Sequence, residues 1–271
     1  NYLPNSQSIH FKNATLWTNE TDGIIKNSDI IINNGKIIAI GKNLETPTDF
    51  KVIDATDKHI TSGIIDEHSH MAASSINEGG HNSSAEVSIM DVINPDDINI
   101  YRNLAGGVTS AQILHGSANP IGGQSAIIKL KWGSEINDMY FEGAAPFIKF
   151  ALGENVKQSN WSGSRFPQTR MGVEQVFIAK IWTDYNSLSP RQKRSVAKPR
   201  FDDELETLWE ILRGDRFVSS HSYVQSEINM LMKVAEKFNF RINTFTHILE
   251  GYKVADKMAE HVVGGFTFSD W

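Results

Sequence analysis

Residues 63–80, GIIDEHSHMAASSINEGG, place His68 and His70 directly after a short apolar run. Side chains two positions apart in a strand point to the same side, so both imidazoles should project to one point beside Asp66, which shares their phase. Imidazole nitrogens and a carboxylate at this spacing suit a divalent metal such as zinc. The alternative is a pair of surface histidines in a turn, and the His-Ser-His triplet alone does not decide between the two.

Two more histidines are the last residues of predicted strands. His221 ends RFVSSH and His247 ends INTFTH. A single histidine at such a place is most often a hydrogen-bonded core residue. In a (β/α) barrel, however, the carboxyl ends of the strands meet at one rim, where the chemistry of such enzymes lies. Histidines from three separate strands would share that rim, and this coincidence predicts a metal site.

Lys149 lies within the otherwise apolar stretch PFIKFAL, in phase with Phe147 and Ala151. Burial disfavours the charged form of an ammonium group. A neutral amine can add carbon dioxide to give a carbamate, which is a carboxylate on a long arm and can bridge two metal ions. The alternative is a lysine that pairs with an acid or extends to solvent along its alkyl chain.

The composition narrows the class of protein. The chain has 271 residues, a net charge of −6, 40% hydrophobic and 21% charged residues, which is typical of a globular protein and argues against a nucleic-acid platform. No apolar run approaches the roughly 18 residues of a membrane span. Because there is no cysteine, a metal must be held by His, Asp, Glu or a modified Lys. This composition is compatible with the cytosol or the periplasm, and the first residues predict either that there is no secretory signal or that it has been removed.

The chain is predicted to contain two kinds of structure. Residues 1–61 read as a small β module, with strands near 14–18, 29–32, 36–40, 51–55 and 59–61 and a hairpin at Asn33-Asn34-Gly35. Residues 62–271 alternate strands with helical stretches, which predicts a parallel sheet or barrel. The expected strands are 63–68, 107–113, 126–130, 146–152, 217–221, 241–247 and 265–269, seven of the eight that a closed barrel needs. The expected helices are 95–104 (capped by Asn94, with Pro95 in its first turn), 169–185, 202–213, 226–238 and 252–261.

Two connections stand out between these elements. HGSANPIGGQS, residues 115–125, is interpreted as a glycine-rich loop. Residues 187–200 hold five basic residues and no acid, which is typical of a solvated loop rather than a binding site.

The order of these features resembles the amidohydrolase superfamily over essentially the whole chain. The resemblance rests on DIIINNGKIIAIG, on VIDATDKHITSGIIDEHSH, on Lys149 and on the strand-end His221 and His247. Within this superfamily, the sequence most resembles the imidazolonepropionase-like and prolidase-like branch. Two segments carry this closer resemblance, GGVTSAQILHGSANPIGGQSAIIKLKWG and FIKFALGENVK. The resemblance implies a distorted (β/α)8 TIM-type barrel and a small β-sandwich built from both ends of the chain.

The resemblance also implies a ligand set. His68 and His70 would bind a first metal, Lys149 would bridge as its carbamate, and His221 and His247 would bind a second, giving one or two zinc ions. The family's general base is an aspartate after strand 8, which is expected beyond residue 271. Asp270 follows the seventh strand and does not match that position. The sequence is therefore expected to be a fragment of a longer protein, or to have its remainder in a separate chain, and to be inactive or nearly so by itself.

The reaction implied is hydrolysis of an amide or cyclic-amide C–N bond by water whose pKa the metal lowers to about 7. A prolidase-like dipeptidase and a non-catalytic scaffold that has lost its metals are the alternatives. The substrate would be a small molecule, and a homo-oligomer is compatible with the sequence. Specificity should come from the loops at 74–81, at His115 and at 154–170. Arg165 and Arg170 are candidates for holding a substrate carboxylate, although surface arginines are the commoner case.

Overall fold

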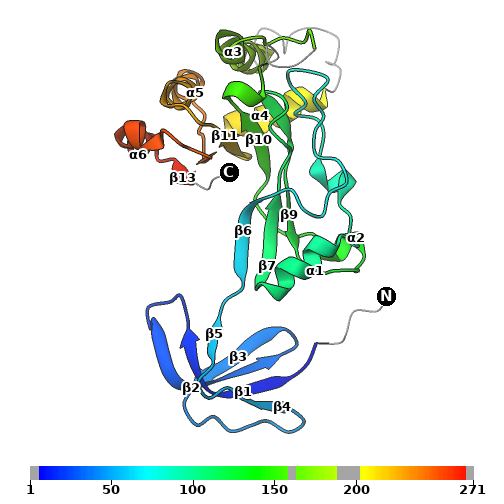
Figure 1. Cartoon of the computed structure of the whole chain (residues 1–271), viewed down its shortest axis with the longest axis vertical. Coiled ribbons are helices and arrows are strands. Elements are labelled where there is room, and N and C mark those ends of the chain that lie inside the picture. Colours follow the sequence, from blue (N-terminus) through cyan, green and yellow to red (C-terminus); the bar gives the residue numbers. More distant parts are fainter. Residues whose placement is uncertain (1–5, 158–162, 188–201, 267–271) are drawn as a thin grey trace. The chain divides into compact units, whose positions relative to one another are not determined.

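The structure is a computed structural model that describes residues 6–157, 163–187 and 202–266. It divides into two compact units, which Figure 1 traces along the chain. The first comprises Asn1–Ile65 with Asn103–Thr109, and the second Asp66–Arg102 with Ser110–Trp271. Each unit is described by itself.

The first unit is a five-stranded sheet in the order β3-β2-β1-β4, with β5 also paired to β1. The predicted hairpin is confirmed: Asn33 pairs with Lys36 across Asn34 and Gly35, both with positive φ as this tight turn requires. The predicted strands of this module are all present, and the first two are longer than expected. Their bounds are β1 (Ile9–Trp17), β2 (Ile24–Asn33), β3 (Lys36–Gly41), β4 (Lys51–Asp54) and β5 (His59–Thr61).

A carboxylate of this sheet is buried. Asp29 is 3% exposed and accepts hydrogen bonds from the backbone N–H groups of Asn13 and Leu44, both at 2.9 Å. His10 Nε2 lies 3.5 Å from the same carboxylate. The contacts join β1, β2 and the loop after β3, and they fix how these segments pack.

The second unit holds two sheets. One has the order β13-β12-β11-β10-β8 and the other β6-β7-β9. β10, β11, β12 and β13 run parallel, as the alternation of strands and helices predicts. The strands are β6 (Ile64–Ser69), β7 (Val108–Ile113), β8 (Ile121–Gln124), β9 (Ala126–Lys129), β10 (Phe147–Ala151), β11 (Phe217–His221), β12 (Thr244–Thr246) and β13 (Gly264–Phe266).

Helices pack against β10, β11 and β12 and form the main core (Figure 1). Phe177, Leu208 and Leu231, one from each of three helices, are fully buried in that core. The α-helices are α1 (Ile98–Ala105), α2 (Ile136–Met139), α3 (Arg170–Ser187), α4 (Asp203–Arg213), α5 (Gln225–Phe238) and α6 (Ala255–His261), and the short 3-10 helices are η1 (Ile89–Val92), η2 (Gly153–Asn155) and η5 (Gly251–Val254). No helix in the described ranges is both long and apolar enough to cross a bilayer.

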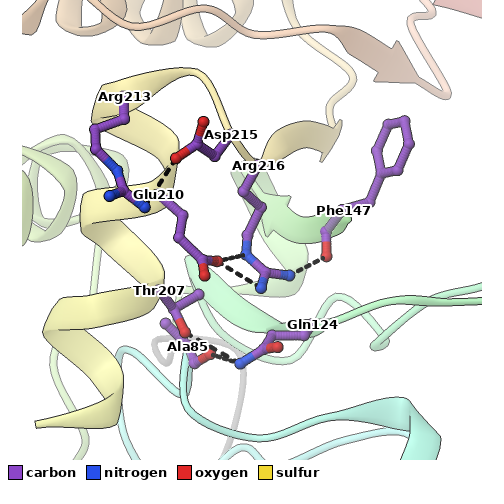
Figure 2. A network of polar contacts seen from close by, with 8 residues as sticks. All are labelled: Ala85, Gln124, Phe147, Thr207, Glu210, Arg213, Asp215 and Arg216. Atoms are coloured by element: carbon purple, nitrogen blue, oxygen red, sulfur yellow. Dashed lines mark hydrogen bonds and ion pairs between the residues drawn. The ribbon is translucent and has the colours of Figure 1, made fainter. Parts of the chain in front are cut away.

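A polar network ties α4 to the sheet (Figure 2). Arg216 donates to Glu210 Oε2 at 2.7 Å and to the Phe147 carbonyl at 3.2 Å, so it links α4 to the first residue of β10. Gln124 donates from Nε2 to the Ala85 carbonyl and to Thr207 Oγ1, each at 3.1 Å. The start of β10 and the end of β8 are therefore both connected to α4 by hydrogen bonds.

The structure corrects three details of the predicted barrel. The described residues form no closed barrel, because the strands belong to two separate sheets. β9 runs antiparallel to β7 instead of continuing a parallel order. Residues 115–125 are not all loop, because β8 pairs antiparallel with β10.

The start of α1 also differs from the prediction. The helix begins at Ile98, so Pro95 lies outside it, and Asn94 Oδ1 accepts from Asp96 N, ahead of the helix. Asp97 Oδ1 instead accepts from Asn99 N at the first turn. Asp270 and residues 188–200 of the basic stretch lie outside the described residues.

Candidate metal centre

Four strands of the second unit position the predicted ligands. His68 lies in β6 and His70 follows it, His221 ends β11, and His247 follows β12. The parallel register aligns these ends, because Ala151 of β10 pairs with His221, and His221 pairs with Thr246. Lys149 lies two residues before the end of β10, with 1% exposure.

The structure brings all four histidines together. Ring centroids are 5.3 Å apart for His68 and His70, 5.1 Å for His68 and His247, and 4.8 Å for His221 and His247. Lys149 Nζ lies 3.2 Å from His68 Nε2. Residues from distant parts of the sequence therefore form one cluster of imidazoles around a buried amine, which we call the histidine cluster: His68, His70, Lys149, His221 and His247.

Burial keeps part of this cluster neutral. The pKa values of His68 and His221 are both lowered to about 2, first by loss of hydration and then by the charge of Lys149 and the neighbouring histidines. A neutral imidazole carries a nitrogen lone pair, which is the form that binds a cation. His70 donates from Nδ1 to the Leu114 carbonyl at 2.9 Å, and this bond makes Nε2 its lone-pair nitrogen.

The donor chemistry fits a borderline divalent cation such as zinc. His221 is 2% exposed, and its Nε2 has no hydrogen-bond partner among the described residues. Buried polar atoms normally have a partner, so this nitrogen is suited to bind a cation. No three His, Asp or Glu side chains of the described ranges are already arranged to hold a metal ion. Neighbouring rings of the cluster are inclined to one another at interplanar angles of 57° to 87°.

His115 lies outside the cluster and has a different environment. It is 1% exposed, donates from Nδ1 to the Gly116 carbonyl at 2.8 Å and accepts at Nε2 from Glu78 N at 2.8 Å. Burial lowers its pKa, and the ring is neutral in this arrangement because Nε2 accepts a hydrogen bond. Both nitrogens are used by backbone groups, so His115 anchors the loop after β6, and a direct contact with substrate would break one of these bonds.

The two candidate arginines are held by protein groups. Arg165 donates from Nη2 to the Ala118 carbonyl at 2.9 Å, and burial lowers its pKa. Arg170 pairs with Glu154 at 2.5 Å and, through Nε, with Glu227 of α5. Arg170 therefore links the segment after β10 to α5, and binding a substrate carboxylate would compete with these ion pairs.

Two further residues of the site were not predicted from the sequence. Tyr223 lies with its ring centroid 4.5 Å from that of His221, and the signal that could have identified it is its place two residues beyond a strand-end histidine. Glu227 is 5% exposed, and burial raises its pKa despite the nearby Arg170. Nothing in the local sequence marks a glutamate in the first turn of a helix as buried.

Comparison with known proteins gives a consistent result. No family model matches. A crystal structure of an amidohydrolase from Thermotoga maritima MSB8 superposes with a TM-score of 0.85 and 31% identity, covering 96% of this chain and 70% of that one. Amidohydrolase tasK of Hapsidospora irregularis is 29% identical over 261 residues, covering 84% of this chain.

A shorter match concerns a dihydroorotase of Halalkalibacterium halodurans, which is 43% identical over 60 residues. The chain spans about a quarter of tasK (26%) and 13% of the dihydroorotase.

Proposed function

Because this chain belongs to the amidohydrolase superfamily, we propose that it forms the centre of a metal-dependent hydrolase that cleaves an amide or cyclic-amide C–N bond. The observation that supports this most is the histidine cluster, in which four imidazoles from three strand ends lie together and one of them contacts a buried lysine. Relatives named dihydroorotase and dihydropyrimidinase favour a cyclic substrate.

We assign the ligand roles as follows. His68 and His70 would hold a first divalent cation, His221 and His247 would hold a second where one is present, and Lys149 as its carbamate would supply a carboxylate ligand. The bound cation would supply a Lewis acid for the substrate carbonyl and acidify water. Zinc fits the nitrogen donors best, and other divalent metals remain outcomes of the metal analysis.

The chain's own residues prepare the site in two ways. Burial keeps His68 and His221 neutral, so no proton has to leave them before a cation binds. The Leu114 carbonyl fixes the tautomer of His70. Addition of carbon dioxide to the Lys149 amine in its deprotonated form would make a C–N bond, release one proton and leave a carboxylate beside the imidazoles.

The test uses the purified full-length protein, because the general base is expected beyond residue 271, and combines metal analysis with a substrate panel. We expect bound zinc, hydrolysis of a cyclic amide that stops on chelation and returns with Zn²⁺, and loss of both in His221→Ala. His59→Ala is the matched control, because His59 is exposed and bonds only to Trp17 Nε1 in the described part of the chain.

The panel also includes X-Pro dipeptides. If the protein cleaves these in preference to cyclic amides, it is a prolidase-like dipeptidase instead. A protein that binds no metal and turns over neither class would contradict the proposal and leave a non-catalytic scaffold.

A further inference from the structure

The register between β6 and β7 places a glutamine beside the histidine cluster. Ile64 N donates to the Gly107 carbonyl and Leu114 N donates to the Ser69 carbonyl, at 2.9 Å and 3.0 Å, so the two strands run in the same direction. In a parallel ladder the second bond sets Ser69 opposite Ile113. Counting back from Ser69 by one residue places His68 opposite Gln112.

Gln112 and His68 project from the same face of this sheet. Partners in a ladder point to the same side, while the residues before and after them point to the other. The neighbours of Gln112 along β7, Ala111 and Ile113, are both 0% exposed and apolar, as expected of the face that packs into a core. On β9 the partner of Gln112 is Ile127, an apolar side chain. The polar neighbour across the ladder is therefore His68.

The carboxamide of Gln112 lacks a partner where one is needed. Gln112 is 8% exposed, and its buried Nε2 has no hydrogen-bond partner within the described ranges. Leaving a buried amide unpaired is costly, so its presence between apolar residues calls for a reason. A carboxamide can turn either its oxygen or its nitrogen toward a neighbour.

His68 offers the matching atom. Its Nε2 lies 3.2 Å from Lys149 Nζ. The other ring nitrogen, Nδ1, is the atom that remains for Gln112. When Nε2 carries the lone pair, Nδ1 carries the proton and can donate to the Gln112 oxygen.

We propose that Gln112 is a positioning residue for His68: its carboxamide binds Nδ1 and holds the ring with Nε2 turned toward the cation site. This inference rests on the proposed function, because it assigns Gln112 to the orientation of a metal ligand. Residues that orient a ligating histidine in this way typically contribute about 10–100-fold to metal affinity.

The test measures Zn²⁺ affinity by chelator competition and, separately, the thermal stability of the metal-free protein. In Gln112→Met we expect Zn²⁺ to bind about 10–100-fold more weakly, while the melting temperature of the metal-free protein stays the same or rises because a buried unpaired amide has been removed. Gln112→Glu keeps an acceptor oxygen and should restore affinity to within a few-fold. A purely structural role for Gln112 would lower the stability and leave the affinity unchanged.

Gln124→Met is the matched control, because it removes a glutamine that already donates to Ala85 and Thr207 (Figure 2). It should lower the melting temperature and leave Zn²⁺ affinity unchanged. If Gln112→Met does not fold, Gln112→Asn, which shortens the side chain and keeps its polarity, decides the question by the same loss of affinity.

The two proposals fail in different ways. If the wild-type protein binds no Zn²⁺, or His68→Ala binds it as tightly as the wild type, the proposed function is wrong and Gln112 has no ligand to orient. If the wild type binds Zn²⁺ and the Gln112 variants bind it equally well, the positioning role alone is overturned.

Discussion

Lys149 Nζ lies 3.2 Å from Nε2 of His68, across 81 residues of sequence. The contact joins an amine in the middle of β10 to the first histidine of the 63–80 segment. An ammonium at this point holds down the pKa of both His68 and His221, although burial is the larger cause in each case. The charge of Lys149 therefore helps to keep these imidazoles neutral, but it would also repel a cation, and the proposed carbamate would replace it with a negative charge.

Carbamate formation at Lys149 can be observed directly. In buffer containing ¹³C-labelled bicarbonate we expect a carbamate carbon resonance from the wild-type protein and none from Lys149→Ala. A short carboxylic acid such as propionate should partly restore metal binding to that variant, because it supplies the missing oxygens. A labelled signal that persists in Lys149→Ala would assign the modification to another amine.

His68 and His115 should respond differently to the same substitution. His68→Ala removes a ligand, so we expect loss of metal and a fall in activity greater than the roughly 10–100-fold typical of supporting residues. His115→Ala should keep its metal and lower the free energy of unfolding by about 1–3 kcal/mol, because Glu78 N and the Gly116 carbonyl lose their buried partner. Metal analysis and urea unfolding check both, and full metal in His68→Ala would contradict the assignment.

The ion pair between Arg170 and Glu227 should contribute more to the stability of the fold than the one between Arg170 and Glu154. The Glu227 side chain is 6% exposed and that of Glu154 is 42% exposed. Arg170→Leu leaves the buried carboxylate unpaired, and we expect a loss of about 1–3 kcal/mol, less than for a fully buried pair because the guanidinium is 43% exposed.

Glu154→Gln is the control for this pair and should cost less than about 1 kcal/mol. The double variant Arg170→Leu/Glu227→Leu should recover part of the loss, since it removes the unpaired carboxylate as well. Chemical unfolding measures all three, and equal losses in Arg170→Leu and Glu154→Gln would show that burial of Glu227 does not decide the energy.

The first unit should lose stability in acid through Asp29. Burial raises the pKa of this carboxyl, but the N–H groups of Asn13 and Leu44 and the charge of His10 outweigh it, so the pKa is below its usual value. A carboxyl with a lowered pKa stabilises the fold above the unfolded-state value of about 3.9, and this contribution is lost as the pH falls through the folded-state pKa. Unfolding followed between neutral pH and pH 3 should show the loss.

Asp29→Asn tests this assignment. An amide presents an NH₂ group to one of the two backbone donors, so we expect a loss of about 1–3 kcal/mol at neutral pH and a weaker dependence on acid. Asp22→Asn, at an exposed turn of the same unit, should change stability by less than about 0.5 kcal/mol. An unchanged acid dependence in Asp29→Asn would assign the effect to another group.

The sequence predicts the local features of this protein well. Asn34-Gly35 predicts its hairpin because few residue types tolerate the positive φ that the turn requires. The strand-end histidines can be recognised in the sequence because each is a polar residue that ends an apolar run. The clustering of these histidines follows from parallel strands, whose ends align. Their roles as metal ligands stay predictions.

The features that sequence reasoning missed depend on distant neighbours. β8 contains Gly122 and Gly123, which have low strand propensity, so the segment resembles a loop. Glycine is required there because a Cβ at Gly122 would lie 2.8 Å from His115 Nδ1. The direction of β9, the partners of Arg170 and the burial of Glu227 are set by tertiary contacts that no short window of sequence contains.

His115 grips its loop through the backbone N–H of Glu78 and not through any side chain of that loop. Every amino acid except proline supplies that N–H group, so this hydrogen bond does not depend on which side chain stands at position 78. The side chains of the loop can therefore change while its backbone contact with His115 is kept.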